Sequence, residues 1–386
     1  MIPYGKQEIN ESDIKAVLSV LKSDFLTQGP KVPLFEQSIS NYCGSKYAVA
    51  LNSATSALHA SCLALGLKKG DWLWTSPNSF VASANCGLYC GAQVDFVDID
   101  PDTYNISIFE LENKLQNAKI NGKLPKVLVV VHFAGQPCEM QKIKSLSKEF
   151  GFYVIEDASH AVGSRYKDNY IGGCKYSDIT VFSFHPVKII TTAEGGVATT
   201  NSETIDRKIR LYRSHGITRD ISQMSEKNSG SWYYEQIDLG FNYRMTELQA
   251  ALGIAQLKRL DEFILKRHSL RSRYDKMLSD LPLVKPFQAE NCFSSLHLYP
   301  IRLKLNFIKD KNRKKIFDEL RDYGIGVNVH YIPIHTQPYY KNLGFKVGDY
   351  PNSESYYNSA ISLPLFSSMT FDQQDEVISI LNKVLG

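Results

Sequence analysis

Long apolar runs, strong net charge and paired cysteine motifs are all missing from this sequence of 386 residues. The longest aliphatic run, VLVVV at 127–131, is far short of the roughly 20 residues that a membrane-spanning helix needs. Lysine and arginine total 44 against 40 acidic residues, and the resulting charge of +4 is spread thinly rather than gathered into a basic patch. We therefore expect neither a membrane nor a nucleic acid as a partner.

The seven cysteines form an odd set without a Cys-x-x-Cys pair. Small buried thiols in a reducing compartment are the expected state of such a set. The first residues, MIPYGKQEINES, lack the basic-then-apolar layout of a secretion signal. These features predict a cytoplasmic protein.

Motifs of several common enzyme classes are also missing. The sequence has no G-x-G-x-x-G, G-x-x-x-x-G-K-[ST], H-E-x-x-H or G-x-S-x-G. The nine histidines are scattered, apart from His330 and His335 in one proline-containing loop. We therefore expect no dinucleotide or P-loop site and no catalytic metal.

Strands and helices are predicted to alternate between residues 34 and 200. The strand candidates are short, β-branched runs, namely YAVALNS, DWLWTS, QVDFVDID, KVLVVVHF, FYVIED, DITVFSF and GGVATT. Strands that are nearly continuously apolar and alternate with helices are typical of a mostly parallel sheet covered on both faces. Ligands of such α/β sheets bind beyond the carboxyl ends of the strands.

A second, smaller α+β domain is predicted after a long proline-free helical pattern that runs from Thr246 to about Leu278. LHLYPIRL and VNVHYI are predicted strands there, and NRKKIFDELRDYG and FDQQDEVISILNKVL are predicted helices. We divide the chain into a large ligand-binding domain with the N-terminal segment, 1–250, and the connector helix with the small domain, 251–386.

Three fragments carry candidate chemistry. The strand of FYVIED ends at Asp157, which places an acid at the ligand edge of the sheet. The strand of DITVFSF delivers Ser183 and is followed by Lys188 in a turn. In NSATSAL, small residues that include Thr55 and Ser56 open a helix, where free N–H groups favour a phosphate.

Each fragment alone also has an ordinary structural explanation. An acid after a strand is commonly a helix cap, a loop lysine is commonly solvated, and Ser or Thr before a helix is a common N-cap. Together, however, a phosphate cup, an acid and a lysine 31 residues after that acid are the parts that a pyridoxal phosphate site requires. Phe80, which follows the DWLWTS strand, fits as an aromatic residue stacked on the cofactor ring.

The motifs of this chain resemble those of one known family. They are, in order, LTQGP, NSATSAL, PNSFVASAN, VDIDPDTYNI, VHFAGQP, EDASHAVGS, FSFHPVK with EGG, YRSHG, GFNYRMTELQAA and HYIPIHTQPYY. The chain is similar over nearly its whole length to the DegT/DnrJ/EryC1/StrS sugar aminotransferases. The resemblance implies fold-type I of the pyridoxal phosphate enzymes, with a mostly parallel seven-stranded sheet.

The resemblance also implies roles for individual residues. Lys188 would hold the cofactor aldehyde and carry the proton, Asp157 would pair with the pyridine nitrogen, and His160 would lie against the ring near its 3′ oxygen. The phosphate would bind the backbone N–H groups of Thr55 and Ser56 and the hydroxyl of Ser183. Asn242 would reach the phosphate of the cofactor bound in the neighbouring subunit. This implies a homodimer in which each active site contains residues of both subunits.

Within the family, LTQGPKVPLFE, NSATSALHAS and FSFHPVKIITTAEGG are similar to the aminotransferases of pseudaminic acid biosynthesis. These aminate C4 of UDP-2-acetamido-2,6-dideoxy-β-L-arabino-hexos-4-ulose, usually with glutamate as donor and 2-oxoglutarate as the product. The candidate substrate contacts come from several segments, and they are Tyr4, Lys6, Gln28, Gly29, His330, Tyr331 and His335.

Other functions of the same fold stay open at this stage. The acceptor is alternatively a dTDP-, GDP- or D-configured UDP-keto sugar aminated at C3 or C4. Some relatives replace the lysine by histidine and become dehydratases, but this chain keeps Lys188. A desulfurase would require a nucleophilic cysteine in a loop near the site, and this chain has no plausible one. A regulatory sensor would require a DNA-binding module, for which this chain has no room. Ala193 replaces the first glycine of the usual Gly-Glu-Gly-Gly, which puts the backbone of that loop in doubt.

Overall fold

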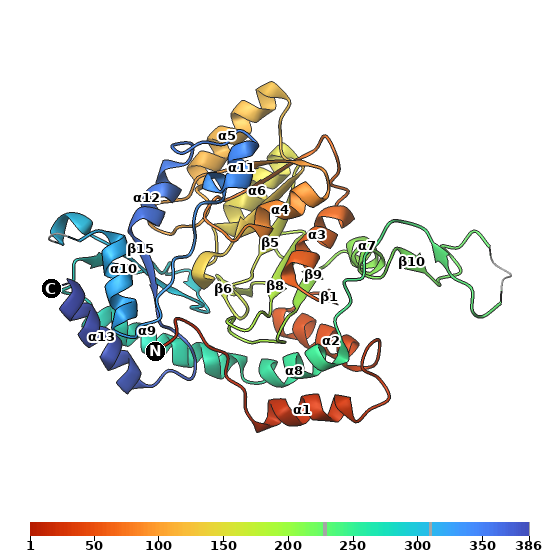
Figure 1. The fold of residues 1–386 in the computed structure, drawn as a ribbon. Coiled ribbons are helices and arrows are strands. Elements are labelled where there is room, and N and C mark those ends of the chain that lie inside the picture. Colours follow the sequence, from red (N-terminus) through yellow and green to blue (C-terminus); the bar gives the residue numbers. More distant parts are fainter. Residues whose placement is uncertain (227–229, 309–310, 386) are drawn as a thin grey trace.

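A computed structural model describes residues 1–226, 230–308 and 311–385. At its centre lies a seven-stranded sheet in the order β1-β9-β8-β5-β4-β2-β3 (Figure 1). The strands are β1 (Tyr47–Leu51), β2 (Trp72–Thr75), β3 (Gln93–Phe96), β4 (Val127–Val131), β5 (Tyr153–Asp157), β8 (Ile179–Ser183) and β9 (Gly196–Thr200). β9 is antiparallel to both of its neighbours, and the other pairs are parallel. This confirms the predicted fold class.

Helices cover both faces of the sheet because the strand residues are apolar on both sides. Val154 packs on one face and its neighbour Ile155 on the other. The first face is covered by α2 (Lys31–Cys43), α5 (Ile108–Asn121), α6 (Met140–Phe150) and α8 (Glu247–Leu257). The second face is covered by α3 (Ala54–Ala64), α4 (Ala82–Tyr89) and α7 (Glu203–Arg213).

The C-terminal part has a core and a three-stranded sheet of its own, in the order β12-β14-β15. Its main elements are β12 (Leu283–Val284), β14 (Tyr299–Leu303), β15 (Ala360–Leu363), α9 (Leu260–Met277), α10 (Arg313–Asp322) and α13 (Phe371–Leu385). Ile2 packs in this core, whereas Ile334 and Tyr340 return to the core of the large sheet. The domain division at residue 250 stays a prediction. Residues from each side of it contribute to the core of the other part.

Shorter elements complete the description. They are α1 (Glu11–Leu21), α11 (Pro338–Asn342), α12 (Pro351–Ser359), β6 (Arg165–Tyr166), β7 (Asn169–Tyr170), β13 (Cys292–Phe293), and the turns η1 (Phe133–Gly135), η2 (Leu305–Phe307) and η3 (Ile334–Thr336). Within the described residues, no helix has the length and apolar character needed to cross a membrane.

Two predicted elements differ from the structure. The long helix is broken, because α8 ends at Leu257 and α9 begins at Leu260. At the break, Arg259 turns its guanidinium onto the buried carboxylate of Asp13, with Nη2 at 2.6 Å from Oδ2. This contact holds the N-terminal segment in place. The predicted strand VNVHYI forms only one isolated bridge, between Asn328 and Ser362.

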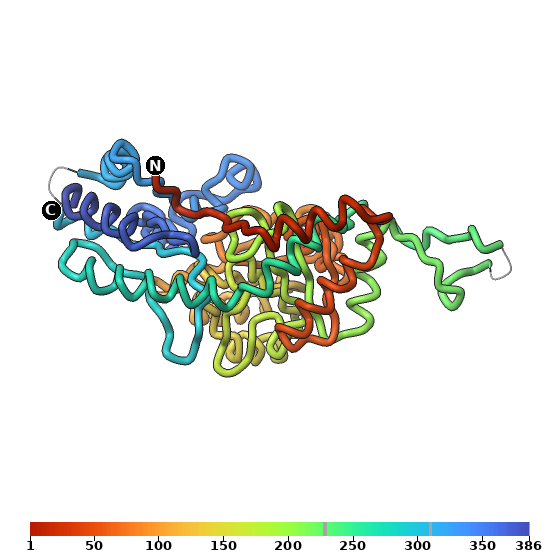
Figure 2. The backbone as a smooth tube through the Cα atoms, turned by 90° about the horizontal axis from the view of Figure 1, so that it is seen from below, coloured from red at the N-terminus to blue at the C-terminus, as the bar shows by residue number. Residues whose placement is uncertain are grey.

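A narrow arm leaves the body of the molecule after α7. Its base is the hairpin of β10 (Ile217–Thr218) and β11 (Glu235–Gln236). In both views the arm extends well beyond the sheet and the helices (Figures 1 and 2). Several large apolar side chains on it are exposed, among them Trp232 and Leu239.

Candidate active site

A cavity of about 530 Å³ lies at the carboxyl ends of the central strands, within the range of roughly 300–1,000 Å³ typical of small-molecule sites. Its walls come from strand ends, from the first turns of α3 and α4, and from the C-terminal part of the chain. The predicted residues that line it are Tyr4, Thr55, Phe80, Asp157, His160, Ser183, Lys188, His330 and Tyr331. The structure thus brings the three candidate fragments together.

The first turn of α3 presents backbone donors to the cavity. Ser53 is the N-cap, and its Oγ accepts the N–H of Ser56 at 3.1 Å. The N–H groups of Ala54 and Thr55 have no acceptor within the helix, because first-turn amides never do. Gly196 makes this approach possible, since a Cβ there would lie 2.5 Å from the backbone nitrogen of Ala54. Ser56 is therefore tied to the cap, while Thr55 faces the ligand side.

Strand alternation separates the two acids at the end of β5. Asp157 faces the cavity, and its Oδ2 accepts the hydroxyl of Ser83 at 2.6 Å. Glu156 lies on the other face of the sheet, where His132 Nε2 is 2.7 Å from its Oε2. Both acids are buried, but only Asp157 is placed to meet a ligand.

Lys188 lies in the loop of residues 184–195 between β8 and β9. Two backbone bonds close the loop, from Phe184 N to Gly195 O at 2.9 Å and from Thr192 N to Phe184 O at 3.0 Å. Ala193 takes the left-handed conformation with φ of 65°, so this loop adopts a glycine-like backbone despite the alanine. Burial lowers the pKa of the Lys188 amine from 10.5 to about 8, against the opposing effect of the Asp157 carboxylate.

This lowered pKa predicts a specific pH dependence for cofactor-free protein. Below about pH 8 the Lys188 amine is protonated and not nucleophilic, and above it the neutral amine reacts. Competitive labelling with trace acetic anhydride, followed by peptide mass spectrometry, should give a midpoint for Lys188 near pH 8. A midpoint near the value of about 10.4 for a free lysine would contradict the environment described here.

Histidine and tyrosine rings form the wall opposite the strand ends. His160 Nδ1 accepts the N–H of Ala134 at 3.3 Å, and its Nε2 is 3.0 Å from the Tyr331 hydroxyl. Burial, together with the nearby Lys188 cation and His330, lowers the pKa of His160 well below its usual value. Burial and the same cation lower the pKa of His330 to about 3. Both imidazoles are therefore neutral near pH 7.

Six predicted residues lie outside the cavity lining of their own chain, namely Lys6, Gln28, Gly29, Ser56, Asn242 and His335. His335 is fully buried, and its Nε2 is 2.9 Å from Glu354 Oε1. Gln28 and Asn242 are exposed on neighbouring segments, because Thr27 pairs with Thr246 in an isolated bridge. Two of the predicted segments therefore form one exposed surface outside the cavity lining.

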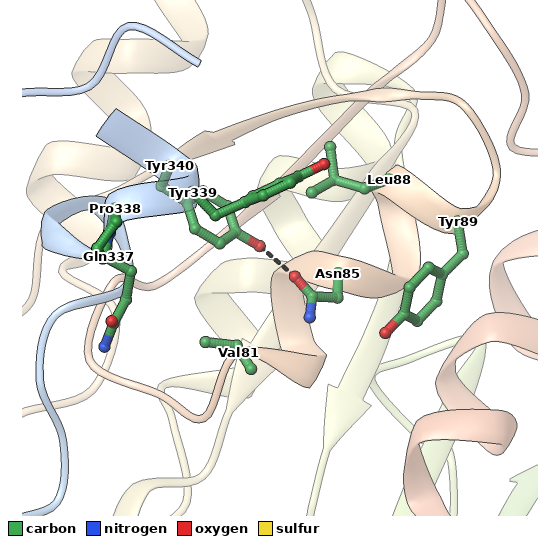
Figure 3. A pocket seen from close by; sticks show the side chains of 8 residues that line it. All are labelled: Val81, Asn85, Leu88, Tyr89, Gln337, Pro338, Tyr339 and Tyr340. Atoms are coloured by element: carbon green, nitrogen blue, oxygen red, sulfur yellow. Dashed lines mark hydrogen bonds between the residues drawn. The ribbon is translucent and has the colours of Figure 1, made fainter. Parts of the chain in front are cut away.

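A separate groove of about 650 Å³ runs between α4 and α11 (Figure 3). Its floor is largely apolar, and the Tyr340 hydroxyl donates to Asn85 Oδ1 at 2.6 Å across it. The residues that line it include no carboxylate, amine or imidazole. The candidate chemistry therefore lies in the cavity at the strand ends.

Comparison with known proteins identifies this arrangement. The model of the DegT/DnrJ/EryC1/StrS aminotransferase family matches residues 7–382. The chain belongs to this family. UDP-4-amino-4,6-dideoxy-N-acetyl-beta-L-altrosamine transaminase of Campylobacter jejuni (strain 81-176) is 40% identical to it over 390 residues, which cover 100% of this chain and 98% of that protein. The spore coat polysaccharide biosynthesis protein SpsC of Bacillus subtilis is 38% identical, covering 100% and 97%.

Solved structures agree with the family. Helicobacter pylori PseC, an aminotransferase of pseudoaminic acid biosynthesis, superimposes with a TM-score of 0.90 at 33% identity and covers 100% of this chain and 99% of its own. Spr1654 of Streptococcus pneumoniae, a putative sugar aminotransferase in its PMP form, gives 0.89 at 30% identity, with coverage of 100% and 99%. The chain is a fold-type I, pyridoxal-phosphate-dependent sugar aminotransferase that acts on nucleotide sugars.

The cavity of this aminotransferase fits pyridoxal phosphate. The free N–H groups at the start of α3 suit its phosphate, the Asp157 carboxylate suits its ring nitrogen, and the amine of Lys188 suits its aldehyde. When bound, the cofactor supplies the aldehyde that takes up the amino group and a ring that acts as an electron sink. Lys188 has no carboxylate partner within salt-bridge distance in the described residues, so its amine is available.

Several residues of the site escaped the sequence argument, among them Ser83, Ser159 and His297. Ser83 lies inside α4 and donates to Asp157, yet in the sequence it is one of many small residues in a helical pattern. His297 lines the cavity from the segment before β14, which had the pattern of a buried strand. The available signal was a single imidazole within the apolar run LHLYPI.

Proposed function

We propose that this aminotransferase moves an amino group from glutamate to C4 of a UDP-linked 4-keto-6-deoxy-N-acetylhexosamine, UDP-2-acetamido-2,6-dideoxy-β-L-arabino-hexos-4-ulose. The product is UDP-4-amino-4,6-dideoxy-N-acetyl-β-L-altrosamine, and the reaction belongs to pseudaminic acid biosynthesis. The observation that carries the proposal is the full-length identity of 40% to a transaminase named for this product, with Lys188 retained in the cavity.

The residues of the cavity divide into groups by the part of the reaction they serve. Thr55 and Ser183 bind the phosphate, Phe80 covers the ring, and His160 lies near its 3′ oxygen, whereas the N–H of Ser56 is already bonded to Ser53 Oγ at 3.1 Å. Asp157, fixed by the Ser83 hydroxyl, keeps a proton on the ring nitrogen. The Lys188 amine has a pKa of about 8, which suits a group that both accepts and returns a proton near neutral pH.

The substrate wall is formed by residues from opposite ends of the chain. The rings of Tyr4 and His330 are tilted by 54° to each other with centroids 5.3 Å apart, and Tyr331 follows His330 in the chain. These three side chains offer hydroxyl and imidazole groups to a sugar near the lysine. Gln28, Gly29 and Lys6 are proposed to contact the distal part of the nucleotide sugar.

We propose a homodimer with composite sites. Asn242 is exposed and outside the cavity of its own chain, which fits a role at the cofactor phosphate of the partner. The segment that carries Gln28 adjoins the segment of Asn242, and the two belong to one exposed surface. Apolar side chains exposed nearby, among them Phe25 at 52% and Leu26 at 51%, are suitable for burial between two subunits.

The decisive experiment is mass spectrometry of the products after incubation with glutamate and a panel of UDP-, dTDP- and GDP-linked 4-keto-6-deoxy sugars. Conversion of the UDP-N-acetyl sugar of L-arabino configuration alone is the expected result. Conversion of another sugar instead overturns the proposed substrate and leaves the family, the cofactor and Lys188 unchanged. The Lys188→Ala variant serves as the control without turnover.

A further inference from the structure

His297 is an unassigned side chain in the cavity, and the backbone around it is firmly held. The N–H of His297 donates to Ala134 O at 2.9 Å, and Ser295 Oγ donates to His160 O at 2.9 Å. The rings of His297 and His160 lie with centroids 4.4 Å apart. The position of the His297 ring is therefore fixed relative to the wall that faces Lys188.

The nitrogen atoms of His297 are unpartnered although the side chain is only 4% exposed. Nδ1 is buried without a hydrogen-bond partner in the described part of the chain, so Nε2 is left to face the cavity that His297 lines. A buried N–H without an acceptor costs more than a bare lone pair, so the proton belongs on Nε2. His297 thus presents a neutral N–H donor to whatever occupies the cavity.

A buried cation lies directly behind this histidine. Arg267 is 1% exposed, and its Nη1 donates to the carbonyl oxygens of Leu296, His297 and Leu365 at 3.2, 3.2 and 2.9 Å. Among the described residues no carboxylate pairs with it. Burial lowers its pKa only to about 10, so the guanidinium stays charged at neutral pH. The wall behind His297 is therefore electropositive.

The same cavity has to accept two unlike substrates in turn. An amino acid donor brings carboxylates, whereas the ring of the keto sugar is neutral. No arginine lines the cavity, and Lys188 is its only ammonium group among the described residues. An arginine in the cavity lining would have no carboxylate partner while the sugar is bound, and an unpaired charge is costly in a buried site. A neutral N–H backed by a remote cation serves both substrates.

We propose that His297 binds a carboxylate of the amino donor through Nε2, with Arg267 as the positioning residue behind it. The proposal rests on the proposed function, because it requires a carboxylate-bearing donor such as glutamate. It assigns His297 to one half of the reaction. The sugar half does not require an anion-binding group at this place.

The test measures the two half-reactions of the holoenzyme separately, from the cofactor absorbance change that accompanies amino transfer. Losing a hydrogen bond to a charged group should weaken glutamate binding roughly tenfold to hundredfold in His297→Phe. The rate of the keto-sugar half-reaction in His297→Phe should stay within about threefold of the wild-type rate, because hydrogen bonds between uncharged groups contribute less. His297→Gln, which keeps an N–H donor, should recover part of the loss. Calorimetric titration with glutarate gives a readout that does not depend on turnover.

His268→Phe is the matched control. His268 Nε2 is 2.8 Å from Ser294 O, so its loss loosens the same segment from outside the cavity. A glutamate-specific loss in His297→Phe that His268→Phe does not reproduce supports the proposal. Equal losses in both half-reactions, unchanged glutarate binding, or the same defect in His268→Phe overturns it. Wild-type enzyme that fails to react with glutamate contradicts the proposed function itself, and that reaction is measured first.

Discussion

Replacing Lys188 by alanine is expected to abolish multiple turnover. The lysine is the only side-chain amine in the described cavity, so the variant loses both the group that holds the cofactor aldehyde and the group that moves the proton. Loss of a positioned acid–base group alone typically costs about 10²–10⁴-fold in rate, and loss of the tether adds to this. Product formation measured by mass spectrometry over many enzyme equivalents checks the result.

The same variant should still bind the cofactor without a covalent bond. Thr55, Asp157 and Phe80 are unchanged, and the loop backbone is closed by bonds that do not involve the lysine side chain. Cofactor absorbance that remains with the protein after gel filtration measures binding. Borohydride should fail to attach the cofactor covalently to the variant, because Lys188 is missing. Lys148→Ala, on the exposed side of α6, is the matched control. Retained multiple turnover in Lys188→Ala would falsify the assignment of the lysine.

Replacing Asp157 by asparagine should reduce kcat by about 10²–10³-fold, the usual effect of removing one preorganised electrostatic group. Asparagine keeps the size of the side chain and can still accept the Ser83 hydroxyl, which lies 2.6 Å from Oδ2 in the wild type. It lacks the negative charge that keeps a proton on the ring nitrogen. Steady-state kinetics with saturating cofactor measure the loss.

The control for this variant is Asp168→Asn, which removes the same charge from an exposed turn. Its activity should equal that of the wild type. A kcat within tenfold of the wild type in Asp157→Asn would mean that the ring nitrogen is not protonated by this residue. The Ser83→Ala variant should fall between the two, since it loosens the carboxylate and leaves its charge.

The sheet and the cofactor-side residues could be predicted because their signals are local. Each central strand is an apolar run, and Asp157, Ser183 and Lys188 follow strand ends where a parallel sheet places its ligand. The broken helix could not be predicted, because neither glycine nor proline marks it. The break instead accompanies contacts between Arg259 and Asp13, which are far apart in the sequence.

The residues of the substrate wall were harder to predict, because their positions also depend on contacts between distant parts of the sequence. His335 has the same residue type as His330 and lies in the same loop, yet one is paired with Glu354 and the other lines the cavity. The difference arises from how the loop packs against α12 and the large sheet. His297 was hidden by its apolar neighbours. It differs from the buried His335 in lining the cavity, and no ring nitrogen of His297 has a hydrogen-bond partner such as Glu354 among the described residues.

The environment that tunes Lys188 also affects how long the protein survives. A pKa of about 8 in place of 10.5 corresponds to a penalty of about 3 kcal/mol on the folded cofactor-free chain. The penalty applies fully below pH 8, where the amine is charged in both states, and it fades as the pH rises towards 10.5. Cofactor binding adds its own free energy to the stability of the folded state. We therefore expect cofactor-free copies to unfold and to be degraded sooner, so that the supply of the cofactor affects the steady-state abundance of the chain as well as its active fraction.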